Sequence, residues 1–103
     1  MVKIIWTARA LADLEDIGEF ISKDSQRYAK LTLEKLIERA KMVEQSPKIG
    51  RIVPEISQPD IREIITGNYR IIYQTTDIEL AYILTIHHSS RLLSNNTVFN
   101  DDK

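Results

Sequence analysis

The stretch IREIITGNYRIIYQT, residues 61–75, decides the fold that this sequence predicts. Its two apolar runs, 61–66 and 69–75, are rich in β-branched and aromatic residues, which favour strands. The pair Gly67-Asn68 between them is typical of a tight turn, so the two runs are expected to form an antiparallel hairpin. A second short turn leads to a third such run at 79–88, and the three strands together form a meander.

Two helices are predicted before this meander. In residues 8–22 the apolar side chains recur at the spacing of one helical face, and Thr7 can accept a hydrogen bond from the first turn. A second stripe of the same spacing predicts a helix of about 20 residues, capped by Asp24 or Ser25. The first stripe is Ala10, Leu14, Ile17 and Ile21, and the second is Ala29, Leu33, Leu36, Ala40 and Val43, widened by Ile37. An acidic outer face is expected from the residues off the first stripe, which are Asp13, Glu15, Asp16 and Glu19.

The remaining segments complete the predicted order. VKIIW, residues 2–6, predicts a short first strand, and the short link between the helices predicts an antiparallel helical hairpin. Residues 47–60 contain all three prolines of the chain, so a structured loop is expected there. The predicted fold is α+β with two layers, β-α-α-β-β-β, in which the helical hairpin packs on a small, largely antiparallel sheet. One domain is expected over residues 1–93, and the polar residues 94–103 are expected to form a mobile tail or a docking segment.

Composition excludes several classes of function. The 103 residues suit one domain, and the absence of cysteine excludes disulfides and thiolate metal sites, which fits a reducing cytoplasm. The apolar runs are far shorter than the roughly 20 residues that span a bilayer, and the N-terminus has no secretory pattern, so a soluble cytoplasmic protein is expected. A net charge of −1 argues against strong binding of free nucleic acid, which a basic face mediates. No cofactor is expected.

Arg70 lies in the middle of the second strand of the hairpin. Because side chains alternate along a strand, Arg70 is expected on the sheet face that does not meet the helices, partly open to solvent. Along residues 80–88 the even-numbered side chains are expected on one face and the odd-numbered ones on the other, which places His87 or His88 near Arg70. The ordinary alternatives for Arg70 are a solvated charge or an ion pair with an acid such as Glu63. The two histidines are adjacent and face opposite sides, so no metal site is expected.

Four segments of the sequence, one of them from the hairpin, together match the pattern of a known family. They are WTARALADLEDIGEFI (6–21), GRIVPE (50–55), IREIITGNYRIIY (61–73) and ILTIHHSSRLL (83–93). Together they resemble the RelE/ParE superfamily of bacterial toxins, the toxic halves of type II toxin–antitoxin pairs, often called plasmid stabilisation proteins. This resemblance implies one of two activities. RelE-like members cut messenger RNA in the ribosomal A site, whereas ParE-like members bind and poison DNA gyrase and have no established catalytic residues.

The resemblance also implies roles for individual residues. In a RelE-like nuclease, Arg70 would be the cation that stabilises charge on phosphorus, and His87 or His88 would be the general acid. Glu55, in the VPE segment, would be the base that takes the proton of the ribose 2′-OH. The residues that would hold phosphates or another target are Arg51, Arg62 and Arg91. Structural roles are the alternative: an ion pair between Arg70 and Glu55 that orients the loop, and a core position for His88.

Departures from the RelE-like pattern favour the ParE-like branch. From residue 51 onward the chain has five basic and seven acidic residues, whereas RelE-like nucleases are typically strongly basic. Ser89-Ser90 stand where several RNA-cutting relatives have a tyrosine, and the segment HHSSR resembles the His-x-x-Arg ending of ParE-like chains. The predicted function is therefore a growth-arresting toxin that poisons DNA gyrase. A ribosome-dependent endoribonuclease and a non-toxic relative that binds an antitoxin are the alternatives, so enzymatic activity stays open.

A cognate antitoxin is the partner that the resemblance implies. Such antitoxins are partly disordered and fold across the toxin when they bind. An apolar edge of the helical hairpin and an unpaired sheet edge are the expected docking surfaces. The apolar edge consists of Leu11, Phe20, Tyr28 and Leu31, which lie outside the main stripes. The alternative is that Leu11 and Phe20 complete the core.

Overall fold

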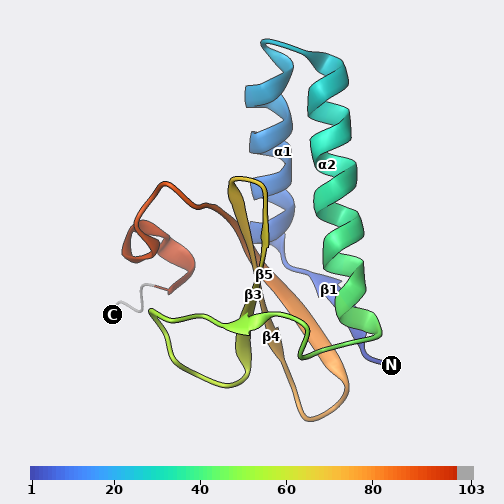
Figure 1. Ribbon diagram of the computed structural model, residues 1–103, viewed down its shortest axis with the longest axis vertical. Coiled ribbons are helices and arrows are strands. Elements are labelled where there is room, and N and C mark those ends of the chain that lie inside the picture. The colour runs from blue at the N-terminus through green and yellow to red at the C-terminus, as the bar shows by residue number, and fades with distance from the viewer. Residues whose placement is uncertain (100–103) are drawn as a thin grey trace.

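Two antiparallel helices pack on one face of a five-stranded sheet in the computed structural model, which describes residues 1–99 (Figure 1). The strands are β1 (Lys3–Trp6), β2 (Arg51–Ile52), β3 (Ile61–Thr66), β4 (Tyr69–Thr75) and β5 (Leu80–His88), and the helices are α1 (Ala8–Ser22) and α2 (Gln26–Lys41). Short 3-10 helices form at Met42–Glu44, Leu93–Asn95 and Thr97–Phe99. The predicted two-layer α+β fold is confirmed. Within residues 1–99, neither α1 nor α2 is long and apolar enough to cross a membrane.

The first and last strands in sequence lie side by side in the sheet. Its order is β1-β5-β4-β3-β2, so β1 and β2 are the two edge strands. β1 pairs with β5 in parallel, and the other neighbours are antiparallel. A parallel pair needs a long crossover, which the helical hairpin supplies. β2 adds one short strand inside residues 47–60, where the sequence predicts only a loop.

Both helices begin at predicted caps. Thr7 accepts a hydrogen bond from the Ala10 N–H, and Ser25 accepts one from the Tyr28 N–H. These bonds satisfy backbone N–H groups that have no partner inside the helix. The Thr7 hydroxyl also donates to Ile83 O (2.8 Å), which ties the start of α1 to β5.

The core between the helices and the sheet contains much of the two predicted stripes. Its buried members are Ala10, Leu36, Ala40, Val43, Ile71, Tyr73, Ala81, Ile83 and Ile86. Two details of the second helix differ from the prediction. Ile37 is 47% exposed, because α2 packs on α1 and the sheet through Leu36 and Ala40 and its other flank meets solvent. α2 has 16 residues because its last turn tightens into the 3-10 helix Met42–Glu44.

A β-bulge in β5 changes which of its side chains face the helices. The pairing runs Ile72↔Thr85 and then Tyr73↔Ile83, which leaves Leu84 as an extra residue. Ile83 and Ile86 therefore both pack against the helices, while Leu84 packs on the opposite side. The predicted odd–even alternation along β5 is wrong for this reason.

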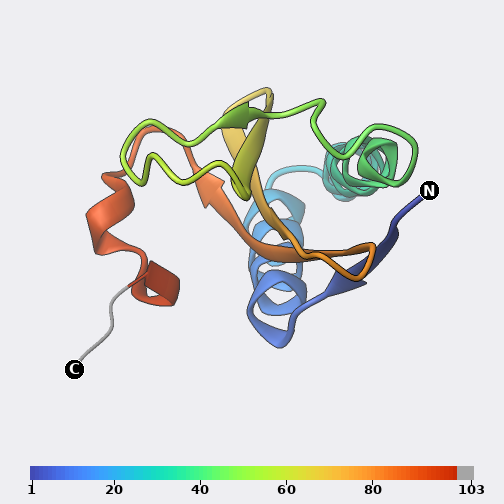
Figure 2. The ribbon, with the colours of Figure 1, turned by 90° about the horizontal axis from the view of Figure 1, so that it is seen from below.

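The face of the sheet away from the helices is covered. The loop after β2 and the C-terminal 3-10 helices pack on this side of the sheet (Figure 2). The second cluster consists of Val53, Ile61, Ile72 and Leu93, with Ile56, Leu84 and Phe99 packed against them. The prediction of a partly open face is therefore wrong. The domain boundary at residue 93 stays a prediction, and residues 100–103 of the predicted tail lie outside the described residues.

Candidate functional site

Arg70 is the centre of a buried ion cluster on the covered face of the sheet. Only 7% of the residue is exposed. Glu63 on β3 has no exposed side-chain surface and accepts a hydrogen bond from Arg70 Nε (2.5 Å). The two terminal nitrogens of Arg70 donate to the two carboxylate oxygens of Glu55 (2.8 and 2.9 Å), in a bidentate pair. The second oxygen of Glu63 accepts a hydrogen bond from Arg51 Nε (2.6 Å).

The cluster fixes the charges of its members. Hydrogen bonds from Arg70 lower the pKa of Glu55 to about 2, against the opposing effect of burial. Hydrogen bonding to Glu55 likewise raises the pKa of Arg70 in spite of its burial. Both ion pairs that the sequence offers as alternatives for Arg70, with Glu63 and with Glu55, are formed. The expectation that Arg70 is exposed is wrong, because the loop that carries Glu55 folds over it.

His87 is enclosed on the same face as Arg70. The two residues are partners in the β4–β5 register, and His87 is buried. Its Nε2 donates to Arg91 O (3.0 Å), since a carbonyl can only accept, and its Nδ1 accepts from the Asn96 amide nitrogen (3.1 Å). The Val98 N–H donates to Asn96 Oδ1 (3.0 Å), which fixes the orientation of that amide. Both ring nitrogens of His87 are therefore engaged by the C-terminal segment.

His88 faces the other side of the sheet. Its ring meets the Tyr69 ring edge-on, with 5.3 Å between the centroids. Its Nδ1 is within hydrogen-bond distance of Ser90 Oγ (2.6 Å), and the side chain is partly exposed rather than part of the core. The two histidines thus face opposite sides, as predicted. Among residues 1–99, no group of three or more His, Cys, Asp and Glu side chains could hold a metal ion.

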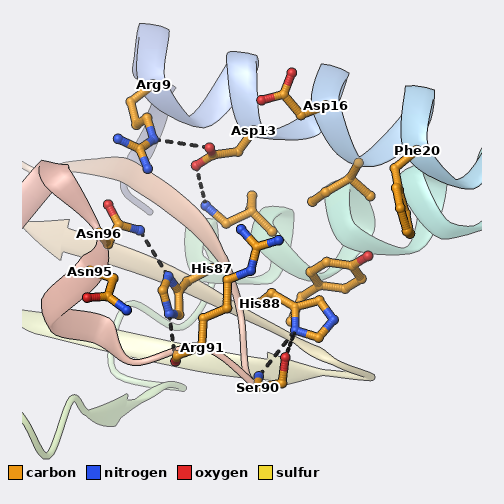
Figure 3. A pocket seen from close by; sticks show the side chains of 13 residues that line it. Arg9, Asp13, Asp16, Phe20, His87, His88, Ser90, Arg91, Asn95 and Asn96 are labelled. Atoms are coloured by element: carbon orange, nitrogen blue, oxygen red, sulfur yellow. Dashed lines mark hydrogen bonds and ion pairs between the residues drawn. The ribbon is translucent and has the colours of Figure 1, made fainter.

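A first cleft of about 570 Å³ lies between α1 and the segment after β5 (Figure 3). Asp13 forms part of its inner wall, where Oδ2 accepts hydrogen bonds from Thr85 Oγ1 (2.5 Å) and from the Ile86 N–H (3.0 Å). β1 ends opposite Ile83, so the Ile86 N–H at this edge of β5 has no strand beside it. The Asp13 carboxylate accepts its hydrogen bond instead. The prediction that Asp13 lies on an outer acidic face is wrong for this reason.

Asn96 links the contact between Asp13 and Thr85 to His87. Its amide nitrogen donates to Thr85 Oγ1 (3.1 Å), so Asp13, Thr85, Asn96 and His87 form one chain of hydrogen bonds. Sequence reasoning missed Asp13, Thr85 and Asn96. Asp13 had a usable signal, because it follows Ala10 by three residues and so borders the buried stripe. Asn96 had none, because one asparagine in a polar stretch has no distinguishing pattern.

A second cleft of about 600 Å³ is lined by residues of both helices and of the β3–β4 turn, and we call it the hairpin groove. The helical hairpin extends past this turn (Figure 1). The lining of the groove includes Phe20, Tyr28, Leu31, Lys35, Thr66 and Tyr69. Phe20 is 70% exposed and Tyr28 is 63% exposed. Phe20, Tyr69 and His88 also line the first cleft, so the two clefts are continuous. The alternative in which Leu11 and Phe20 complete the core is wrong, because both are exposed; Leu11 lies outside both clefts.

The three arginines predicted to hold a target are not gathered at one place. Arg51 and Arg62 lie on neighbouring strands, where Arg51 is exposed and Arg62 donates to Gly50 O (3.0 Å). Arg91 is exposed and lines the first cleft, as Figure 3 shows. Their roles in target binding stay predictions. The same holds for the catalytic roles of Arg70, His87, His88 and Glu55.

Comparisons with known proteins agree with this architecture. The sequence model of the family described as "ParE toxin of type II toxin-antitoxin system, parDE" matches residues 4–93. The chain is 32% identical over 93 residues to Toxin RelE2 of Caulobacter vibrioides, a match that covers 89% of this chain and 100% of that protein.

Solved structures show the same fold. A chain of the chromosomal ParDE toxin–antitoxin system from P. aeruginosa has a TM-score of 0.71 at 21% identity, over 85% of this chain and 96% of that one. A chain of the toxin–antitoxin complex RelBE2 from Mycobacterium tuberculosis has a TM-score of 0.60 at 20% identity, over 84% of this chain and 96% of that one. The family match spans both helices and the whole sheet except the first residue of β1. The chain therefore belongs to the ParE toxin family, within the RelE/ParE superfamily of type II toxin–antitoxin toxins.

Proposed function

We propose that this toxin arrests growth by binding and poisoning DNA gyrase in the cytoplasm, and that a cognate antitoxin neutralises it. The ion cluster of Arg70 is the observation that favours gyrase over messenger RNA. Cleavage by a ribose 2′-OH needs a proton acceptor, a proton donor and a cation that can reach the phosphate. Arg70 has all three guanidinium nitrogens bonded to Glu63 and Glu55.

The other candidate groups are no better placed for acid–base work. Glu55, with its pKa lowered to about 2, is a weak base at neutral pH. His87 has both ring nitrogens bonded inside the C-terminal segment, and His88 lies on the opposite side of the sheet. A chain that acts by binding a protein needs none of these groups free.

The second candidate function is RelE-like cleavage of messenger RNA on the ribosome. The 32% identity to Toxin RelE2 over the full length of that protein favours it. In this case Glu55 has to leave Arg70 when RNA binds, so that the guanidinium can meet a phosphate. Glu55 is half-exposed (48% of its side chain), and its loop is on the surface, so such a movement is sterically possible.

Induction of the intact chain in growing cells separates the two functions. Pulse labelling of DNA and protein is expected to show that DNA synthesis falls first, with a DNA-damage response, and the purified chain is expected to inhibit supercoiling by gyrase. Protein synthesis that stops within minutes, together with cut messages, would overturn the proposal. In that case Arg70→Lys, shown to be folded by its melting temperature, is expected to abolish cutting, because lysine lacks the bidentate fork.

The hairpin groove is the proposed docking surface for the antitoxin. Phe20 and Tyr28 are both exposed and both line this groove, and exposed apolar patches mark interaction sites. Phe20→Asp is expected to prevent co-purification with the antitoxin, the protein whose co-expression restores growth. Leu11→Asp is the matched control, because Leu11 is also exposed on α1 but lies outside both clefts. Equal co-purification of the two variants would show that the antitoxin binds elsewhere.

A further inference from the structure

Thr66 carries a buried polar atom whose bonding is incomplete in the free chain. It is the last residue of β3 and pairs with Tyr69 across the β3–β4 turn. Only 7% of the residue is exposed, and within residues 1–99 its Oγ1 is buried without a hydrogen-bond partner. Buried polar atoms in folded proteins are almost always hydrogen-bonded, and leaving one unpaired is unfavourable. Valine has the same shape and would avoid this cost, so the hydroxyl does not serve the stability of the free chain.

The surroundings of Thr66 indicate a ligand. Thr66 lines the hairpin groove together with large side chains of both helices and of β4. They are Phe20, Tyr28, Leu31, Leu36 and Tyr69. The lining also includes polar side chains, among them Ser25, Thr32 and Asn68, but Thr66 is the one whose hydroxyl is buried without a partner within residues 1–99. In such sites a few polar groups fix the orientation of the ligand, while the apolar area provides affinity.

Charges on the rim indicate the chemistry of the occupant. The groove is lined by two oppositely charged side chains: Asp24, between the two helices, and the exposed Lys35 on α2, a helix with five basic and two acidic side chains. An acidic edge on the occupant would complement the α2 side of the groove, because opposite charges across an interface favour the correct register and partner.

We propose that Thr66 is a specificity-determining residue for the antitoxin. Because Oγ1 is buried in the free chain, the Thr66 side chain rotates about its Cα–Cβ bond when the antitoxin binds. The hydroxyl then bonds to one amide or hydroxyl side chain of an otherwise apolar antitoxin segment, whose acidic edge faces Lys35. This inference rests on the proposed function, in which the hairpin groove binds the antitoxin. A competing segment with an apolar side chain at that position leaves the hydroxyl unpaired and binds more weakly. A site built around a polar group discriminates in this way because the wrong partner leaves that group unsatisfied.

The test compares three variants with the wild-type chain. Titration calorimetry with the purified antitoxin, identified by its restoration of growth, measures binding, and thermal unfolding measures stability. Thr66→Val is expected to raise the melting temperature of the free chain and to weaken binding about 10- to 100-fold, since the antitoxin's polar group then loses its partner. Thr66→Ser retains the hydroxyl and is expected to bind within a few-fold of wild type. Thr75→Val is the matched control, because Thr75 is on β4 and lies outside both clefts.

Each outcome bears on one proposal or the other. Unchanged binding of Thr66→Val overturns the role of Thr66 and leaves the antitoxin assignment intact. A lower melting temperature for Thr66→Val also overturns it, because the hydroxyl then stabilises the free chain. Binding that is lost equally in Thr66→Ser and Thr66→Val also overturns it, because serine retains the hydroxyl, and the loss then follows any change of this side chain rather than removal of the hydroxyl. If no co-expressed protein binds the wild-type chain, the proposed function itself fails.

Discussion

Replacing Arg70 with methionine is expected to destabilise the fold by about 3 kcal/mol, because it leaves a carboxylate buried without its closest cation. Removal of one partner from a buried ion pair costs roughly 3–5 kcal/mol. Glu63 keeps Arg51 at 2.6 Å, but the Arg51 side chain is 62% exposed, so solvent screens it and it compensates only in part. The Glu55 side chain is half-exposed, so it returns to solvent when Arg70 is removed and adds little to the loss of stability. These considerations place the cost at the lower end of the range.

A loss of this size is large for a domain of 103 residues, whose total stability is of the order of 5–15 kcal/mol. The melting temperature is expected to fall by about 12–24 °C, at roughly 4–8 °C for each kcal/mol. Urea unfolding at pH 7, followed by circular dichroism, measures the free energy. Arg91→Met is the matched control, because Arg91 is exposed, and it is expected to change stability by less than about 0.5 kcal/mol.

A double variant decides whether charge is the cause. Adding Glu63→Leu to Arg70→Met removes the stranded carboxylate, and replacing a buried ion pair with apolar side chains is often close to neutral. The double variant is therefore expected to recover at least half of the lost stability. If it is no more stable than Arg70→Met alone, lost packing rather than unpaired charge explains the effect. A single variant within about 0.5 kcal/mol of wild type would refute the reasoning altogether.

Three other perturbations test further parts of the structure. The pKa of Glu55 is depressed from 4.5 to about 2, so its pair with Arg70 contributes stability above pH 4.5 that is lost as the pH falls toward 2; Glu55→Gln is expected to flatten this part of a melting-temperature profile. Tyr73→Phe removes a hydroxyl that donates to Pro47 O (2.7 Å) and accepts from the Gly50 N–H (3.0 Å), and thermal unfolding is expected to show a loss of about 1–3 kcal/mol. Asn96→Ala breaks the link to Thr85 and His87, so hydrogen exchange is expected to accelerate in residues 89–99 while α2 stays protected.

The helices and the hairpin could be predicted because their signals are local. Thr7 and Ser25 each accept a hydrogen bond from a backbone N–H only three residues further along the chain. Gly67 has a positive φ of 60°, a conformation that glycine adopts without strain, so the turn can be recognised from its own residues. The apolar stripes follow from helix geometry alone, and most of their members lie in the core.

The sequence could indicate which residues to consider for the candidate site, but it could not predict which of their side chains are buried. The burial of Arg70 depends on Glu55, which is 15 residues away in the sequence. The covering of the sheet face depends in part on Leu93 and Phe99, which lie in a segment whose polar composition does not predict this position. The bulge at Leu84 depends on the register between two strands, and nothing in the apolar run around it marks the position. Local patterns therefore could predict the elements, while the burial of their charges depended on how distant segments fold back.

The parallel pairing of β1 with β5 affects how the chain is made. β1 is synthesised well before its neighbours in the sheet, residues 80–83. Strand pairs so far apart in sequence form slowly, because the entropy cost of closing a long loop comes before the free energy gained from the contacts. A truncated chain that ends before residue 80 has no partner for β1 and lacks Ile83 and Ile86 of the core. This domain therefore folds only after residue 83 has been synthesised, and messages that are broken before that point yield only unfolded fragments.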